Sequence, residues 1–352
     1  MAKIGAAGLC VVLACACGGG ESPGVYETKA GLAMAALADR YGEPAGSFDF
    51  TWWQTANALE ATIDYTRLTG DQTYLPLVTN SYDKVIAGQS IDTSGDFLND
   101  LYDDESWWAL TLIKAYDLTG DARYLESAKA VFADVAASWD DTCGGGVWWD
   151  RARTYKNAIT NELFLVTAAR LYQRTDDPAY RTWAEDAWAW FDASGMINAS
   201  NGVNDGLVLE TCANNGQTEW TYNQGVILGG LVAMFEITED RAFLTRADAI
   251  ADHAMATLVN ADGVLVEPCE PDCGRDGFQF KGIFMRNLGV LHGATQDSGV
   301  ATFITRQADA IIANAMNERG QIGGLWAGPF DEPESIRQGS GLDALNAAIP
   351  LE

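Results

Sequence analysis

The strongest constraint on the fold is a short phrase that recurs along the chain. Residues 65–75 read YTRLTGDQTYL and residues 116–125 read YDLTGDARYL, with weaker copies around Asp177 and Asp240. In each copy an apolar segment ends, a glycine or polar residue turns the chain, and an aspartate is placed to cap the next helix. Successive aspartates are 50, 56 and 63 residues apart, which suits a pair of helices and a variable loop. The phrase predicts a repeat of helical hairpins.

The segments between these joints form two alternating sets of expected helices. One set is apolar on most faces and is expected to lie inside, whereas the other carries a single apolar stripe and is expected to lie outside. This alternation predicts an all-α fold, an (α/α)6 toroid or barrel of six inner and six outer helices, with an open solenoid of helical pairs as the alternative. The inner helices are expected at 53–68, 104–119, 157–173, 221–238, 278–293 and 341–348, and the outer helices at 28–42, 71–88, 121–139, 177–194, 240–258 and 299–318.

The composition excludes some function classes. The chain has 22 Lys and Arg against 49 Asp and Glu, a formal net charge of −27, so no nucleic-acid partner is expected. Only two histidines are present, which argues against a site built on histidine. The 12 Trp, 12 Tyr and 13 Phe are a heavy aromatic load, and several stand in polar contexts, as in clefts that bind sugars.

The beginning of the chain has the pattern of an export signal. Residues 1–17 combine a basic start at Lys3, an apolar stretch and small residues around cysteines, and are too short to span a bilayer. Cys15 is the expected lipidation site of a bacterial cell-envelope lipoprotein held at the membrane by its lipid anchor, with Cys17 as the alternative. An ordinary cleaved signal of a secreted or periplasmic protein is the other interpretation. Residues 18–25 would be a flexible tether, and residues 26–352 a single catalytic domain, since no Pro/Ser-rich linker interrupts them.

Four cysteines remain beyond that segment. An even number in an exported chain favours disulfides over a zinc site, for which the C-x3-C spacing lacks a matching second pair. Three connectivities are possible, and the sequence does not choose among them. The four are Cys143, Cys212, Cys269 and Cys273.

Loops that lead into the inner helices would meet at one end of a toroid, and here they carry unusual polar and aromatic residues. Any one of these residues could be a helix cap, but several such loops together predict a binding face. An Asx turn is the alternative for Asp205. Lys156 and Lys281 could pair with carboxylates near the site, with a solvent-facing rim position as the alternative. The expected substrate-binding residues are Trp52, Trp53, Tyr102, Trp107, Trp108, Trp148, Trp149, Lys156, Asn157, Asn161, Asp205, Tyr222, Asn223, Gln224, Phe280 and Lys281.

Asp103 and Asp104 are the candidate catalytic pair. Glycosidases need one carboxyl group as a proton donor and a second that is ionised, and adjacent residues hold their carboxyls near the spacing of about 5–5.5 Å that retaining enzymes use. Repulsion between the two would separate their pKa values. The D-D-x-x-D motif of Mg²⁺-dependent prenyl-diphosphate enzymes fits poorly, because its fifth position is Trp107 and the chain is acidic.

These motifs resemble the signature blocks of glycoside hydrolase family 76, in that family's order. The resemblance implies an (α/α)6 barrel and a retaining endo-α-1,6-mannanase that needs no metal or organic cofactor, with Asp103 as nucleophile and Asp104 as general acid/base. Related fungal members act on mannan-bearing cell-wall anchors. No such block is found after about residue 295. The blocks are Tyr102–Trp108, Cys143–Trp149, Tyr155–Asn161, Asn204–Leu207, Trp220–Gly225 and Phe280–Arg286.

We therefore expect a glycoside hydrolase that cleaves α-1,6-mannosidic bonds in mannan or manno-oligosaccharides. A surface lipoprotein that binds mannan without catalysis and a mannan transglycosylase are the alternatives. N-acylglucosamine epimerase-like barrels use histidines in catalysis, and none lies in the convergent loops, since His292 falls late on an expected inner helix. Endo against exo action and tolerance of branches stay open.

Overall fold

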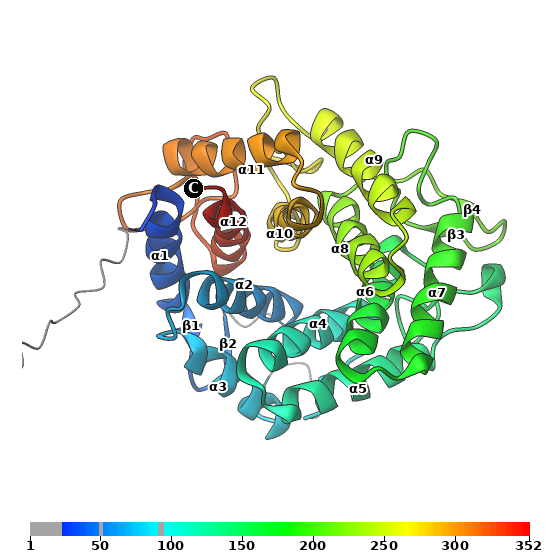
Figure 1. Ribbon diagram of the computed structural model, residues 1–352. Helices are drawn as coiled ribbons and strands as arrows, with labels where there is room; N and C mark the ends of the chain where they lie inside the picture. The colour runs from blue at the N-terminus through cyan, green and yellow to red at the C-terminus, as the bar shows by residue number, and fades with distance from the viewer. Residues whose placement is uncertain (1–22, 49–51, 91–94) are drawn as a thin grey trace, which may run out of the picture.

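The computed structural model describes residues 23–48, 52–90 and 95–352, and within them the chain forms two concentric rings of helices (Figure 1). Inner and outer helices alternate along the chain, as the repeat predicts. The outer ring consists of α1 (Val25–Ala38), α3 (Leu75–Ile86), α5 (Ala122–Ala136), α7 (Pro178–Ala193), α9 (Ala242–Thr257) and α11 (Ser298–Ala310). The inner ring consists of α2 (Trp53–Thr69), α4 (Tyr102–Thr119), α6 (Ala158–Thr175), α8 (Thr221–Thr238), α10 (Gly277–Thr295) and α12 (Ser335–Ala348).

The inner ring is closed. Each inner helix packs against the next one along the chain, and α12 packs against α2. The expected (α/α)6 barrel is confirmed, and the open solenoid is wrong because its two ends would not meet. Two short antiparallel hairpins complete the fold: β1 (Tyr41–Gly42) pairs with β2 (Ser47–Phe48), and β3 (Leu207–Val208) pairs with β4 (Ala213–Asn214).

Most joints form as the repeated phrase predicts, but Asp71 and Asp240 precede the N-cap residues of α3 and α9, which are Tyr74 and Arg241. Gly70 and Gly120 end α2 and α4 in the left-handed conformation, with φ of 76° and 71°, which suits a residue without a Cβ. Asp121 then caps α5 by accepting a hydrogen bond from the backbone N–H of Arg123 at 3.0 Å. Asp177 and Asp297 cap α7 and α11 in the same way.

The last inner helix differs from its expected bounds, because it begins at Ser335 rather than at residue 341. Its glycines weaken the local helix signal. They have a packing role, since a Cβ at Gly341 would lie 2.6 Å from a side-chain carbon of Ile322. Close packing, rather than intrinsic propensity, holds this segment helical.

Two disulfides settle the connectivity of the four cysteines. Cys143 pairs with Cys212, and Cys269 pairs with Cys273. The expected lipidation site at Cys15, and its alternative at Cys17, lie outside the described residues. No helix among residues 23–48, 52–90 and 95–352 is long and apolar enough to span a membrane.

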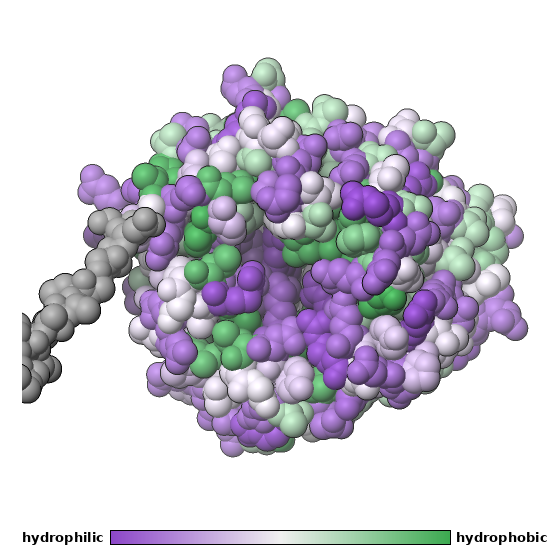
Figure 2. All heavy atoms as spheres, viewed as in Figure 1, coloured by the Kyte–Doolittle hydropathy of each residue, from purple (hydrophilic) through white to green (hydrophobic). Residues whose placement is uncertain are grey.

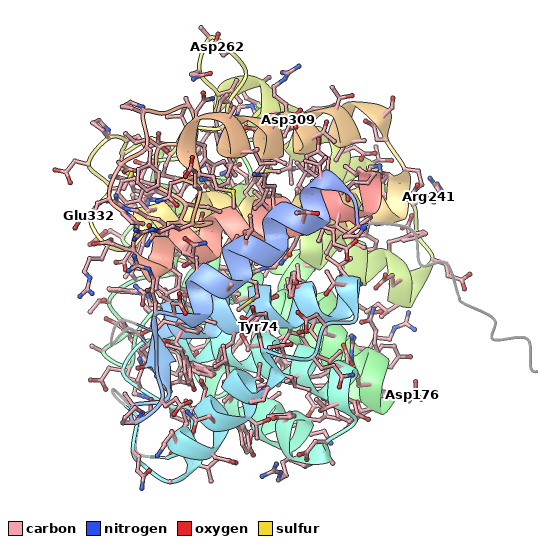
Figure 3. The ribbon with its side chains drawn as sticks, turned by 90° about the vertical axis from the view of Figure 1, so that its left-hand side faces the viewer. Tyr74, Asp176, Arg241, Asp262, Asp309 and Glu332 are labelled. Carbon is pink, nitrogen blue, oxygen red and sulfur yellow. A yellow bond between two sulfur atoms is a disulfide. The ribbon has the colours of Figure 1, made fainter. Side chains whose placement is uncertain are left out.

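The two ends of the barrel differ in character. Loops that enter the inner helices lie at one end and the Thr-Gly-Asp joints lie at the other. Figure 3 shows this from the side, with Glu332 ahead of α12 at one end, and Asp176 and Arg241 after α6 and α8 at the other. The first turn of α1 also lies at the joint end, where the backbone N–H groups of Tyr26 and Glu27 donate to the carboxylate of Glu352.

Candidate active site

Asp103 and Asp104 lie half-buried in the first turn of α4, at the end where the loops converge. Both oxygens of Asp103 accept hydrogen bonds, one from the backbone N–H of Asp104 at 3.0 Å and one from the indole Nε1 of Trp149 at 3.0 Å. Asp104 accepts from the side-chain amide of Asn99 at 2.9 Å. The two carboxyls are therefore held by different partners, so each can keep its own orientation.

The environment of Asp103 shifts its ionisation. Burial raises the pKa of Asp103 to about 7, with a smaller contribution from the charge of Asp276. The hydrogen bonds from the Asp104 N–H and from Trp149 oppose this shift, because a donor stabilises the carboxylate form. Asp103 can thus gain or lose its proton near neutral pH, and the carboxylate form that a nucleophile requires predominates above about pH 7.

A third acid in the same turn has a structural role that the sequence did not reveal. Glu105 is fully buried, accepts from the backbone N–H of Asn99 at 3.0 Å and pairs with Arg151. Burial raises the pKa of Glu105 to about 8. Consecutive helical residues point about 100° apart, so three adjacent acids cannot all face one cleft. The three consecutive acids in a predicted helix could therefore have shown, from the sequence alone, that one of them faces away from the cleft.

Aromatic rings from four inner helices surround the pair. Tyr222 on α8 stacks on Phe280 of α10 with centroids 3.9 Å apart, and Trp53 of α2 lies 6.2 Å from the same ring. Trp53 also stacks on Trp107 of α4 at 5.9 Å. Flat apolar rings at the entrance of a polar site suit the binding of sugar rings.

A second group of acids lies on the α6–α8 side. Asp205 accepts from the hydroxyl of Tyr155 at 2.7 Å, and burial raises the pKa of Asp205. Glu162 is fully buried, and no described residue donates a hydrogen bond to its carboxyl. Burial and the Asp205 charge raise the pKa of Glu162 well above its usual range. Burial and then the charges of Asp205 and Asp103 raise the pKa of Tyr222, so this ring lies among these acids.

Several expected substrate-binding side chains serve the scaffold. Gln224 accepts from the backbone N–H of Val203 at 2.7 Å and donates to its carbonyl at 2.8 Å. The side-chain amide thus makes the pair of hydrogen bonds that a neighbouring β-strand would make. Asn161 makes the same pair of contacts with Val147. Asn157 caps α6 by accepting from the N–H of Thr160 at 3.4 Å. These amides fix the loops of the cleft rather than facing it.

The two lysines are interior cations. Lys156 is fully buried, and its ammonium donates to Asp140 and to the carbonyls of Gly145 and Gly146. Lys281 is also fully buried and pairs with Glu270. Both lysines pair with carboxylates, as considered from the sequence, and neither lies on the solvent-facing rim.

The remaining expected residues divide between core and cleft. Trp52 and Trp108 pack in the core, with ring centroids 4.8 Å apart. Trp148 is buried and donates to Asp140, and the ring of Tyr102 lies under Arg151, so both support the loops. Asn223 is fully buried, and no described residue gives its amide a partner. The residues that the structure brings together around the pair are Trp53, Trp107, Trp149, Asp205, Tyr222 and Phe280.

One further polar contact near the pair escaped the sequence reasoning. Gln54 donates to Asp276 at 2.5 Å, and the Asp276 charge acts on Asp103. Within the described part of the chain, no cluster of three or more His, Cys, Asp or Glu side chains could hold a metal ion.

Comparisons with known proteins agree with this geometry. The family model described as glycosyl hydrolase family 76 matches residues 28–349. A curated relative, mannan endo-1,6-alpha-mannosidase DCW1 of Candida albicans, is 29% identical over 280 residues, covering 71% of this chain and 61% of that protein. The chain thus spans about 60% of the length of the curated relatives it matches.

Two solved structures have the same fold. The Lin0763 protein of Listeria innocua superposes with a TM-score of 0.83 at 26% identity, covering 93% of this chain and 97% of that one. The GH76A alpha-1,6-mannanase of Salegentibacter sp. HEL1_6 superposes with a TM-score of 0.83 at 24% identity, covering 93% of this chain and all of that one.

Proposed function

Because the chain belongs to glycosyl hydrolase family 76, we propose that it hydrolyses α-1,6-mannosidic bonds within mannan chains. The names of its curated relatives, mannan endo-1,6-alpha-mannosidases, support the substrate. The observation that carries the proposal is the pair Asp103 and Asp104, held by separate hydrogen-bond partners beneath an aromatic entrance. Linear α-1,6-mannan or a manno-oligosaccharide is the proposed ligand, and no cofactor takes part in the steps below.

The proposed reaction is a double displacement. Asp103 attacks the anomeric carbon as a carboxylate, while Asp104 gives its proton to the glycosidic oxygen and the bond to the leaving sugar breaks. Asp104, now ionised, then takes a proton from water, and the resulting hydroxide displaces Asp103 from the anomeric carbon. Two displacements restore the α configuration in the product.

The roles of the two aspartates rest on their partners. Trp149 and the backbone N–H of Asp104 can only donate, so each favours Asp103 as the carboxylate that attacks. Asn99 orients Asp104 by donating a hydrogen bond to one of its carboxylate oxygens. Asp205 and Tyr222 are proposed to bind sugar hydroxyls beside the pair, since the charges of both Asp205 and Asp103 act on Tyr222.

Chemical rescue tests this assignment. An Asp103→Ala variant should regain turnover with azide on an aryl α-mannoside and yield the β-mannosyl azide, because azide replaces the nucleophile. An Asp104→Ala variant should yield the α-mannosyl azide, because azide then attacks the covalent intermediate. If Asp103→Ala gave the α-mannosyl azide and Asp104→Ala the β-mannosyl azide, the roles of the two aspartates would be reversed. Full activity of either variant without azide would show that the replaced residue is not catalytic. Asp262→Ala, at an exposed loop tip, is the control.

Product analysis separates hydrolysis from the two alternatives. Incubation with linear α-1,6-mannan should generate new reducing ends. Longer oligosaccharides would indicate transfer to another sugar, and an unchanged polymer that still binds the protein would indicate a binding module.

We further propose that the protein is exported and tethered through a lipid on Cys15, or on Cys17. Two disulfides support an oxidising compartment. Cys15→Ala should move the protein from the membrane fraction to the soluble exported fraction. If neither Cys15→Ala nor Cys17→Ala changes the fractionation, the tether is not a lipid on these residues.

A further inference from the structure

The end of the barrel opposite the candidate active site is hollow. A cavity of about 660 Å³ lies there, among the carboxyl-terminal halves of the inner helices. Figure 2 shows this face, with a depression at its centre where hydrophilic residues gather. A volume of this size is typical of sites for small molecules.

Charged side chains of both signs line this cavity, and its acidic residues are Asp64, Asp117, Glu236 and Asp343. Five of the chain's 22 lysines and arginines line it. Four of the five are paired with carboxylates. Lys114 lies 2.6 Å from Asp64, Arg174 lies 2.5 Å from Asp117, Arg286 lies 3.2 Å from Asp343, and Arg67 lies 3.7 Å from Asp64.

Arg170 on α6 is the exception. It is half-buried and lines the cavity, but no described residue accepts a hydrogen bond from its guanidinium or pairs with it as a carboxylate. Glu60, whose charge acts on Arg170, is already paired with Lys114 at 2.8 Å and with Arg286 at 3.2 Å. Burial, together with the nearby charges of Arg174 and Arg286, lowers the pKa of Arg170, although the charges of Glu60 and Asp64 act in the opposite direction.

The helix dipole does not explain why a cation lies at this position of α6. A positive side chain stabilises the negative end of a helix dipole, but the effect is confined to about the last turn. Arg170 lies five residues before the end of α6 at Thr175, so its guanidinium is more than one turn from that end. A buried guanidinium is normally hydrogen-bonded on several of its donors.

We propose that this cavity binds a small organic anion whose carboxylate or phosphate group pairs with Arg170. The planar guanidinium offers two parallel N–H donors that match either oxyanion. Apolar side chains of Leu118 and Val290 in the same wall would contact the carbon part of the ligand. Neutral mannan carries no such group, so this site is separate from the candidate active site in both place and ligand chemistry.

Calorimetric titration of the purified chain tests the proposal. Sodium phosphate and sodium citrate are the two probes, with sodium chloride at matched ionic strength as the blank. We expect saturable binding of at least one probe, and the tighter one identifies phosphate or carboxylate as the preferred group. Arg170→Met should weaken that binding by at least about tenfold, since a hydrogen bond to a charged group is lost. Arg181→Met is the matched control, because Arg181 is exposed on α7.

A second variant leaves Arg170 in place. Gly293 on α10 lines the cavity, and a Cβ there would meet no atom within 4 Å. Gly293→Phe should therefore place a side chain in the space beside Gly293, narrow the cavity and weaken the binding, and its melting temperature shows whether the fold is kept. No saturable binding to the wild-type chain would overturn the proposal. Equal affinities of the wild-type chain and Gly293→Phe for the probe would also overturn the proposal. This comparison decides the question even if Arg170→Met does not fold.

Discussion

Replacing Lys156 by methionine should lower the free energy of unfolding of the protein, because this lysine is buried and does not lie on the solvent-facing rim that the sequence left open. The ammonium lies 2.9 Å from Asp140 Oδ1 and 2.7–2.9 Å from the carbonyls of Thr142, Gly145 and Gly146. Methionine keeps the apolar stem over the ring of Trp148, which lies 4.9 Å from the ammonium in the native protein. The variant therefore removes the charge and its hydrogen bonds with little change in volume.

The size of the effect follows from burial. Breaking a buried ion pair by removing one partner costs about 3–5 kcal/mol. The Lys156 side chain is 0% exposed but that of Asp140 is 26% exposed, so water can reach the remaining carboxylate and the cost should lie toward the lower end. The carbonyls of Gly145 and Gly146 then lose a donor, and each such buried acceptor costs about 1–3 kcal/mol if nothing replaces it. About 3 kcal/mol for the ion pair and at least about 1 kcal/mol for each of the two carbonyls together give an expected loss of about 5 kcal/mol or more in the free energy of unfolding.

Urea unfolding followed by tryptophan fluorescence measures this loss. The midpoint should fall while the slope with denaturant stays unchanged. Lys129→Met is the control, because Lys129 forms only an exposed pair with Glu126 on α5 and should change stability by less than about 1 kcal/mol. A change below about 1 kcal/mol for Lys156→Met would refute the scaffold role. A raised KM for mannan at unchanged stability would restore a role in substrate binding.

Three further predictions concern the site and the ring. Because burial raises the pKa of Asp103 to about 7, kcat/KM should fall below about pH 7 as the proposed nucleophile becomes protonated. Trp149→Phe should move this acidic limb of the pH profile to higher pH, because it removes a donor that favours the carboxylate. NMR of the first products from a linear manno-oligosaccharide, before mutarotation, should show α-mannose ends, and initial β ends would mean that one catalytic carboxyl lies outside the pair. Gly225→Ala should destabilise the ring by several kcal/mol in thermal unfolding, since its Cβ would lie 2.5 Å from the Cα of Phe284, and an unchanged melting temperature would show that α8 and α10 can separate.

The sequence predicted the barrel well because its signals are local. Helical periodicity, the left-handed glycines and the capping aspartates act within a few residues, so the joints at Gly120 and Asp121 could be placed without knowledge of the rest of the chain. The end that carries Asp103 followed from the same logic, since helices that alternate in direction must gather their entering loops at one end.

The roles of single polar residues could not be predicted, because they depend on partners far away in the sequence. Gln224 is held by Val203, 21 residues before it, and Lys281 by the carbonyl of Gly324, 43 residues after it. An amide or an ammonium has the same identity in the sequence whether it binds a sugar or a loop. Only the tertiary contacts distinguish the two, and they show that many polar residues near the cleft hold its walls in place.

The contact of Tyr26 and Glu27 with Glu352 has a practical consequence. This contact lies on the face of the barrel opposite the Asp103 pair. Pro350, on the same face, lines the cavity that we propose binds an organic anion. A lipid, a fusion partner or a solid support joined before Gly24 or after Glu352 is therefore attached at the end of the barrel opposite the candidate active site. A protein immobilised by either end would hold its catalytic face outward, toward a polymer too large to diffuse around it.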